Sequence, residues 1–404
     1  MRFLTSIVAA AWLLAGGAFA APSATDLAAI AAVESRITPM GSTEGKTLAA
    51  RMAELKVPGV SVAFIEDGKV KWTRTYGVAD VSDDRPVTPD TLFQAASMSK
   101  AVAAAGALRL VEQGRLDLDG DVNARLKTWQ VPASPHTAAE KVTLRRLLSH
   151  SAGLTVSGFP GYAAGKPIPS DVQMLDGKPP ANTPAVRSFE PPGRGYAYSG
   201  GGYTVAQLLM VEAGGQPFPK LLDRLILRPA GMRSSTFVQP LPQAVVRKAA
   251  SAHDPKGAVI PGARHTYPEY AAAGLWTTPS DYGRFLIALQ RAYSGEPRAI
   301  LDRAPARTML TPVLSGYGLG MIIEPRGQRL AIQHSGGNEG FQCHSFAFLD
   351  GSRQGVVIMT NGSGGWRLAR EVLAAMETAY GWDKAGKPPE GLNRRAPLVA
   401  QAAP

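Results

Sequence analysis

The sequence predicts an α+β fold, in which an antiparallel sheet built from N- and C-terminal strands is flanked by helices and carries a mainly helical inserted lobe. Short β-like runs occur near the start of the 404-residue chain and return near its end. Helical segments separated by Pro- and Gly-containing loops fill most of residues 115–300. The simplest arrangement of this order is one sheet assembled from both termini, with the helical segment inserted between its halves.

The first 112 residues change from helical to strand character and back. Residues 23–56 read as two helical segments, and a hairpin follows, with strands at 60–65 and 70–78 joined by an Asp-Gly turn. From 97 to 112 the pattern is helical and nearly all apolar. A helix that is apolar on every side is a buried helix.

The C-terminal part returns to strands. Four short β-like runs lie at 318–323, 330–334, 341–349 and 355–360. A helix is expected at 366–380, followed by a Pro- and Ala-rich flexible tail at 386–404.

These elements predict one domain, residues 21–385, with two lobes. The sheet lobe comprises residues 21–95 and 300–385, and the helical lobe comprises 96–299. A cleft between two lobes is the usual place for a binding site.

The N-terminus has the pattern of a signal peptide. Arg2 precedes an apolar stretch at 3–15, and small residues end at Ala18-Phe19-Ala20. The apolar run is shorter than the roughly 20 residues of a bilayer span. We therefore expect cleavage of residues 1–20 and a periplasmic or secreted protein; the alternative is a retained membrane anchor.

Charge and cysteine content exclude several classes of function. The formal net charge is +11, but there is no Lys/Arg run and no basic stripe, so we expect no nucleic-acid partner. The single Cys343 cannot form an internal disulfide and is expected to be a buried small side chain. His334 and His344 lack further ligands at metal spacing, so we expect no metal and no cofactor.

The first motif with chemical meaning is Ser97-Met98-Ser99-Lys100, at the start of the apolar helix. Residues i and i+3 share a helix face, so the Ser97 hydroxyl and the Lys100 amine can meet. Burial among alanines lowers the pKa of the amine, which can then accept the hydroxyl proton. The alternative is that Ser97 only caps the helix while Lys100 reaches outward to solvent.

Two further motifs are weaker by themselves. Tyr198-Ser199-Gly200 stands in a glycine run, and a phenol near a lysine can relay protons. Taken alone, the run reads better as a turn leading into a helix at 204–212, with core tyrosines. The third motif begins at His334 on the exit of a predicted strand, where a backbone N–H can serve an oxyanion hole. Its alternative is an ordinary histidine at the end of a strand.

Together, in this order, the three motifs resemble those of the serine β-lactamase and penicillin-binding protein superfamily. This superfamily includes class C β-lactamases, D-alanyl-D-alanine carboxypeptidases, D-aminopeptidases and related esterases. The resemblance covers about residues 45–380 and includes the stretch from Leu147 to Leu154. It implies the β-lactamase/transpeptidase-like fold.

The resemblance also implies roles for individual residues. Ser97 would form an acyl-enzyme, and Lys100 and Tyr198 would shuttle protons. The N–H groups of Ser97 and Gly337 would form the oxyanion hole. Residues expected along the substrate are His334, in the motif's cationic position, together with Ser335, Gly336 and Gly200.

Two positions depart from the superfamily pattern. Gly200 stands where the second motif commonly has Asn, which removes an anchor for a substrate amide. His334 stands where β-lactamases usually have Lys, and an imidazole is only partly charged at pH 7. Both departures favour esters, or unusual amides, as substrates.

The sequence therefore predicts an exported serine hydrolase acting on small esters, β-lactams or D-amino-acid peptides, with esters slightly preferred. The absence of a G-x-S-x-G pentapeptide counts against an α/β-hydrolase, the competing class of serine enzyme. A non-turnover protein that binds peptidoglycan or β-lactams is the alternative. The oligomeric state is not encoded in any pattern we recognise.

Overall fold

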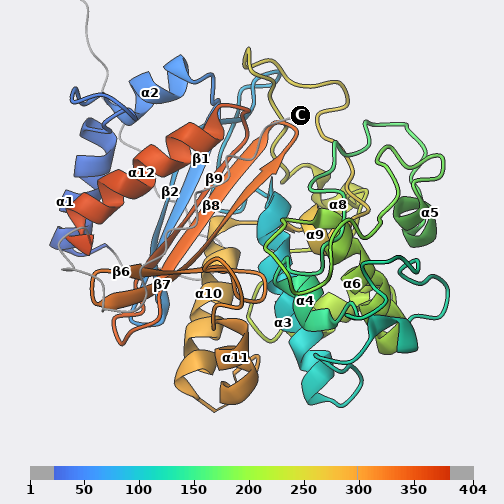
Figure 1. The fold of residues 1–404 in the computed structure, drawn as a ribbon. Coiled ribbons are helices and arrows are strands. Elements are labelled where there is room, and N and C mark those ends of the chain that lie inside the picture. Colours follow the sequence, from blue (N-terminus) through green and yellow to red (C-terminus); the bar gives the residue numbers. More distant parts are fainter. Residues whose placement is uncertain (1–21, 298, 383–404) are drawn as a thin grey trace, which may run out of the picture.

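A seven-stranded antiparallel sheet forms the centre of the molecule (Figure 1). The structure is a computed structural model that describes residues 22–297 and 299–382. The strand order is β3-β2-β1-β9-β8-β7-β6, so the first strand pairs with the last. The strands are β1 (Gly59–Glu66), β2 (Lys69–Asp80), β3 (Arg85–Pro86), β6 (Ile322–Arg326), β7 (Arg329–Asn338), β8 (Phe341–Phe348) and β9 (Gly355–Thr360). The α+β fold class predicted from the sequence is confirmed.

Helices cover both faces of this sheet. Along β1, Val62 and Phe64 pack into one core and Ile65 into the other, as alternation along a strand requires. The first core lies under α1 (Ala24–Ser35), α2 (Leu48–Glu54) and α12 (Gly365–Ala379), on the left of Figure 1. The opposite face packs against α10 (Pro279–Ser294). The expected boundary at residue 299 put α10 in the helical lobe, yet this helix lies on the sheet.

A second, two-stranded sheet has no counterpart among the expected elements. It pairs β4 (Phe93–Gln94) with β5 (Trp276–Thr277). Strand β4 lies immediately before the segment that carries Ser97. Each strand has two residues, too few to show a period of two in the sequence. The predicted run at 318–323 is also displaced, because β6 begins only at Ile322.

The remaining helices gather around α3 (Ser99–Glu112), which is buried along most of its length. A short 3-10 turn, η1 (Ala96–Met98), precedes it. The other elements are η2 (Val122–Ala124), α4 (Leu144–Leu148), α5 (Asp171–Asp176), α6 (Gly200–Gly214), α7 (Phe218–Leu222), η3 (Asp223–Leu227), α8 (Gln243–Val246), α9 (Tyr270–Ala273) and α11 (Arg303–Met309). The buried helix expected at 97–112 is thus present, with its first turn tighter than an α-helix.

The glycine run is the first turn of α6 rather than a turn before it. The helix was expected to begin at residue 204, but it begins at Gly200. Ser199 caps it, because the Ser199 hydroxyl accepts a hydrogen bond of 2.8 Å from the Gly202 N–H. A satisfied cap and burial outweigh the low helix propensity of glycine here.

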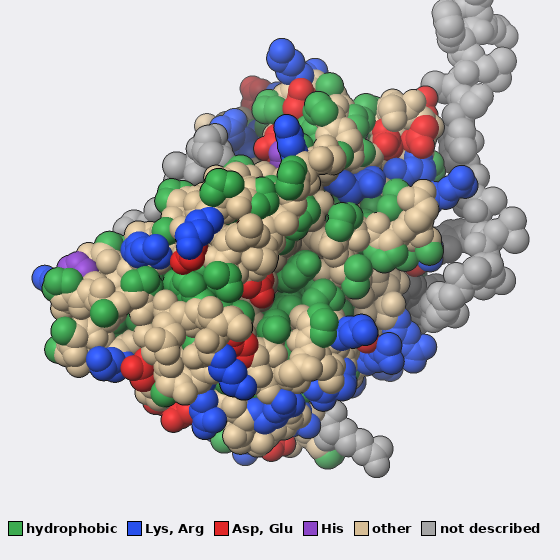
Figure 2. Space-filling view, turned by 90° about the vertical axis from the view of Figure 1, so that its right-hand side faces the viewer, with side chains coloured by type: hydrophobic (Ala, Val, Ile, Leu, Met, Phe, Trp, Pro, Cys, Tyr) green, Lys and Arg blue, Asp and Glu red, His purple; other side chains and the backbone are tan. Residues whose placement is uncertain are grey.

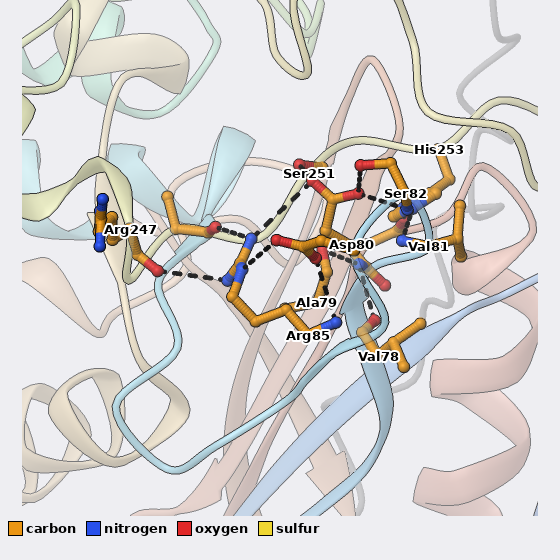
Figure 3. Close-up of polar contacts among 12 residues, drawn as sticks. Val78, Ala79, Asp80, Val81, Ser82, Arg85, Arg247, Ser251 and His253 are labelled. Atoms are coloured by element: carbon orange, nitrogen blue, oxygen red, sulfur yellow. Dashed lines mark hydrogen bonds and ion pairs between the residues drawn. The ribbon is translucent and has the colours of Figure 1, made fainter.

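Polar contacts tie the end of β2 to the middle of the chain (Figure 3). The Asp80 carboxylate accepts hydrogen bonds from Ser82 and from the Ser251 hydroxyl. The Arg85 guanidinium donates to the carbonyl oxygens of Arg247 and Ala249, at 3.3 and 3.0 Å. These contacts hold the N-terminal hairpin against a segment more than 160 residues away in sequence.

The surface and the single cysteine agree with the sequence patterns. Figure 2 shows the face on the right of Figure 1, where basic side chains are scattered among apolar and neutral ones. Cys343 is buried and free. Within the part of the chain described above, no helix is both long enough and apolar enough to cross a membrane. The expected signal peptide (1–20) and most of the expected tail (386–404) lie outside the described residues.

Candidate active site

The site is built around a direct contact between Ser97 and Lys100. The Lys100 amine donates a hydrogen bond of 3.0 Å to the Ser97 hydroxyl oxygen and another of 2.9 Å to the carbonyl oxygen of Ala272 in α9. Lys100 is buried, with 2% of its surface exposed, whereas Ser97 is half-buried and reachable from solvent. The alternative in which Lys100 reaches outward is therefore wrong.

Burial changes the protonation of this amine. Desolvation lowers the pKa of Lys100 to about 7, far from its ordinary value of 10.5. In the described part of the chain, Lys100 forms no ion pair with a carboxylate. Such an ion pair would have favoured the charged form of the amine. At neutral pH a large fraction of the amine is uncharged and can accept a proton from the hydroxyl beside it.

The backbone before Ser97 is strained. Ala96 adopts a left-handed conformation with φ of 48°, which costs an alanine about 1 kcal/mol. Neighbouring groups hold it there: the Ala95 N–H donates to the carbonyl of Leu275, and the Met98 carbonyl accepts from the Tyr282 hydroxyl. Strain of this kind is common where a structure fixes a reactive side chain. Here it turns the chain so that Ser97 enters η1 beside strand β7.

Strand β7 approaches this turn closely. A Cβ added at Gly336 would lie 2.1 Å from the Ala95 carbonyl oxygen, so only glycine allows this contact. Ser335, the preceding residue, is half-buried, and Gly337, the next one, is exposed at the edge of the site. The third motif is thereby brought to the Ser97 segment, with the backbone of Gly337 on the accessible side.

His334 differs from its expected character. Its Nε2 accepts a hydrogen bond of 2.9 Å from the Tyr317 hydroxyl, since Nδ1 must donate to the Ser335 carbonyl oxygen. Burial, reinforced by the nearby charge of Lys100, lowers the pKa of His334 to about 3. The expected partial positive charge on His334 is wrong, because burial beside a lysine disfavours the imidazolium. Contact between His334 and substrate stays a prediction.

Tyr198 lies beside the amine. The Lys100 nitrogen is 4.9 Å from the centre of the Tyr198 ring and 5.5 Å from that of Tyr203. Both rings come from the segment that starts α6, so the second motif meets the first in space. Tyr203, which is fully buried and donates from its hydroxyl to the Leu148 carbonyl, is the core tyrosine of the alternative interpretation.

Sequence reasoning left three neighbours of the site without a role: His150, Tyr317 and the Ala272 carbonyl. The His150 ring lies 4.1 Å from the Tyr198 ring and 4.8 Å from the Tyr317 ring, measured between centroids. His150 belongs to the stretch Leu147 to Leu154 that carries part of the family resemblance, which was the available signal. Tyr317 and Ala272 gave none, because their relevance depends only on chain packing.

At the start of α6, an aromatic ring occupies the space beside Gly200. A Cβ added at Gly200 would lie 2.6 Å from the Phe159 ring and 3.2 Å from the Ser157 carbonyl oxygen. The Gly200 N–H in turn donates to that carbonyl at 3.3 Å. A loop from the segment 155–195 therefore covers the position where related proteins carry an asparagine.

The site is identified by its side chains and not by a surface hollow. Two surface hollows, one beside Leu116 and Leu209 and one beside Arg145 and Arg307, include neither Ser97 nor Lys100. Among residues 22–297 and 299–382, no group of three or more His, Cys, Asp and Glu side chains could hold a metal ion. What the site offers is a hydroxyl, an adjacent amine with a lowered pKa and a phenol.

Residues 45–379 match the family described as Beta-lactamase. The chain belongs to this family. The β-lactamase family is of the serine hydrolase type, and its relatives and structural neighbours include an esterase, a carboxypeptidase and an amidase.

Curated relatives of the β-lactamase family match over part of their length. Protein flp of Staphylococcus aureus is 27% identical over 237 residues, which are 56% of this chain and 42% of flp. Esterase EstB of Burkholderia gladioli is 31% identical over 228 residues, which are 53% of this chain and 57% of EstB. The chain thus spans about half the length of the curated relatives it matches.

Several solved structures share the fold. D-amino acid amidase from Ochrobactrum anthropi superposes with a TM-score of 0.67 at 22% identity, covering 90% of this chain and 99% of the amidase. D-alanine carboxypeptidase AmpC from Burkholderia cenocepacia has a TM-score of 0.63 at 20% identity, covering 81% and 96%. At this identity the likeness shows the fold alone.

The buried amine generates a prediction for Lys100→Met. The rate at which an active-site acylating reagent modifies the wild type should rise about tenfold per pH unit up to pH 7 and then level off, as Lys100 loses its proton. Lys100→Met should lose about 10²-fold or more of this rate and lack that pH limb. Stopped-flow or gel-based labelling across pH 5–9 measures both.

Lys100→Met should lower the labelling rate but raise the stability of the folded protein. The unfolded lysine binds a proton up to about pH 10.5 but the folded one only up to about 7, so the wild type loses stability as pH falls through this window. The Tm of Lys100→Met minus that of wild type should grow from pH 10.5 to pH 7 and be constant below. A difference in Tm that does not vary with pH would contradict the lowered pKa.

Proposed function

We propose that this protein is a serine esterase that forms an acyl-enzyme on Ser97 and prefers small neutral esters over β-lactams and D-amino-acid peptides. The single observation that carries the proposal is the 3.0 Å contact between the Ser97 hydroxyl and a buried Lys100 amine. Membership of a serine-hydrolase-type family supports the same chemistry. The ester preference rests on the uncharged His334 on one side of the site and on Gly200, packed against the Phe159 ring, on the other.

The acylation step uses the contact directly. Lys100, in its uncharged form, takes the proton from the Ser97 hydroxyl while the oxygen attacks the ester carbonyl carbon. The carbonyl π electrons move to its oxygen, which the N–H groups of Ser97 and Gly337 would stabilise. Collapse of this intermediate breaks the bond to the alkoxide, which receives the proton from Lys100, directly or through Tyr198.

Deacylation reverses the roles with water in place of the alcohol. A water molecule loses a proton to the uncharged Lys100 amine, directly or through the Tyr198 hydroxyl, as its oxygen attacks the acyl carbon, and Ser97 leaves with that proton. The Lys100 nitrogen lies 4.9 Å from the centre of the Tyr198 ring, so the two side chains are direct neighbours. Ser97, Lys100 and Tyr198 are thus the proposed catalytic residues.

The uncharged state of His334 argues against substrates that carry a carboxylate. Recognition of such a group in a buried site requires a cation or several donors. His334 is neutral, and its Nε2 is occupied as an acceptor from Tyr317. Lys100 acts here in its uncharged form. β-Lactams and peptides with a free carboxylate therefore lack an ionic partner at these two positions.

The Gly200 side of the site argues against amides. The second motif has no side-chain amide that could bind a substrate N–H, and the Phe159 ring fills the adjacent volume. An ester has no N–H to satisfy, so its binding loses nothing by this replacement. The likeness to esterase EstB, at 31% identity over 228 residues, adds support from a relative named for ester hydrolysis.

We also propose export, on the sequence of residues 1–20 alone. Expression with this segment in a Gram-negative host should give mature protein in the periplasmic fraction, shortened by about 20 residues. Intact mass and N-terminal sequencing of that fraction measure the cleavage. Full-length protein that stays with the membrane fraction would support an anchor instead.

The nucleophile is tested by labelling. A fluorophosphonate probe should attach one group to the wild type, located on Ser97 by peptide mass spectrometry, and none to Ser97→Ala. Ser99→Ala is the matched control, because Ser99 is buried and bonds to the Leu275 N–H instead of Lys100. Equal labelling of wild type and Ser97→Ala would refute the assignment.

The same preparations decide substrate class. Turnover of p-nitrophenyl acetate or butyrate should exceed turnover of nitrocefin by about 10²-fold or more in kcat/KM. An acyl group from nitrocefin that is trapped on Ser97 without turnover would instead identify a penicillin-binding protein that does not turn over.

The role of the Phe159 ring is tested with Gly200→Asn. Because the new side chain must displace that ring, the variant should lose about 1–3 kcal/mol of stability and gain no nitrocefin turnover. The double variant Phe159→Ala/Gly200→Asn should recover Tm and raise the nitrocefin-to-ester ratio of kcat/KM. Phe159→Ala alone is the control; an unchanged ratio in the double variant would contradict the proposed role of this position.

A further inference from the structure

His150 contacts the chain on both sides of Tyr198. Its carbonyl oxygen accepts a hydrogen bond of 2.8 Å from the Ala197 N–H, and its ring Nδ1 accepts one of 3.0 Å from the Ser199 N–H. One residue therefore holds the two peptide groups that flank the proposed proton-relay tyrosine. The connection spans 49 residues, so it is a tertiary contact between the end of α4 and the start of α6.

The His150 ring also packs against the tyrosine itself. The two ring centres are 4.1 Å apart, and the rings of Tyr317 and Tyr203 lie at 4.8 and 5.2 Å from the other sides. His150 is 1% exposed, and its Nε2 has no hydrogen-bond partner among the described residues. The histidine thus fixes the plane and the backbone of Tyr198 while the other tyrosines fix the histidine.

The backbone of His150 indicates that the side chain matters. Helix α4 ends in a Schellman motif: the His150 N–H bonds to the Leu147 carbonyl and the Ser151 N–H to the Arg146 carbonyl. His150 occupies the left-handed position of this motif with φ of 56°, where glycine or asparagine is the usual and less strained residue. A histidine at this position destabilises the backbone relative to glycine, and its ring contacts offset that cost.

The ring is suited to be a permanent acceptor. Nδ1 receives the Ser199 N–H, so the proton of the neutral imidazole is on Nε2. Burial, and after it the proximity of the Lys100 amine, hold the pKa of His150 well below its ordinary range. The groups that face it are Lys100, His334 and the tyrosines 196, 198, 203 and 317, none of which is a carboxylate.

We propose that His150 is a positioning residue for the reaction: it clamps Tyr198 through hydrogen bonds to the peptide groups on both sides and keeps the phenol beside the Lys100 amine. This role rests on the proposed function of Tyr198 as a proton relay. It does not require His150 to touch substrate or to exchange a proton. It predicts that loss of the ring affects the chemical steps more than substrate binding.

The test compares His150→Gly with His150→Asn. Glycine suits the left-handed position, so the fold is retained while the acceptor and ring are lost. Asparagine also suits that position, and its side-chain oxygen lies where Nδ1 lay, so it keeps the bond to Ser199. For p-nitrophenyl butyrate we expect kcat to fall about 10- to 100-fold in His150→Gly with KM within about threefold, and to recover at least partly in His150→Asn.

The pH profile gives a readout that a purely structural role would not move. Removing the ring admits water beside Lys100, so the pKa of the amine rises and the acid limb of kcat should shift to higher pH by about one unit. His253→Asn is the matched control: His253 is equally buried and its Nδ1 bonds to the Asn361 carbonyl, away from Ser97. Its Tm should fall, whereas its kcat and pH profile should match the wild type.

The outcomes separate this proposal from the proposed function. Labelling of wild-type Ser97 by a fluorophosphonate supports the serine hydrolase whatever the His150 variants do. With that labelling present, a folded His150→Gly variant with wild-type kcat and pH profile would overturn the clamp. Equal losses in His150→Gly and His150→Asn would overturn it as well, because the hydrogen bond to Ser199 would then contribute nothing.

Discussion

The uncharged amine of Lys100 is the constraint on which the site depends. An ammonium next to Ser97 could not accept the hydroxyl proton, and an amine exposed to water would be protonated at neutral pH. Burial inside α3 lowers the pKa of Lys100 to about 7, and the Ala272 carbonyl and Ser97 hydroxyl satisfy its hydrogen bonds without supplying a negative charge. A carboxylate at either place would restore the charge and disable the base.

Keeping this amine dry has consequences for its neighbours. Apart from the Ser97 hydroxyl, its neighbours are a backbone carbonyl and two aromatic rings, which exclude water and tolerate either protonation state. His334 is uncharged for the same reason that Lys100 has a lowered pKa, since both groups are buried, and the nearby amine lowers the pKa of the imidazole further. The preference proposed for neutral esters thus follows from the same burial that lowers the pKa of Lys100.

Backbone strain appears where the reactive side chains are oriented. Ala96 and His150 both adopt left-handed conformations, one directly before the proposed nucleophile Ser97 and the other against the proposed proton relay Tyr198. In each case neighbouring hydrogen bonds hold the unfavourable conformation. The close approach of Gly336 to Ala95 then completes the site from the sheet side.

By itself, the sequence determined what short-range geometry controls. The i, i+3 spacing within an apolar helix placed Ser97 and Lys100 on one helix face, with an outward-pointing Lys100 as the alternative that the structure removed. Strand periodicity with turn signals was enough to predict the sheet. Only tertiary structure decided the protonation of His334, the clamp of His150 on Tyr198 and the ring of Phe159 beside Gly200. These depend on which distant segments exclude water from one another, and burial is a property of the packed chain, not of any local pattern.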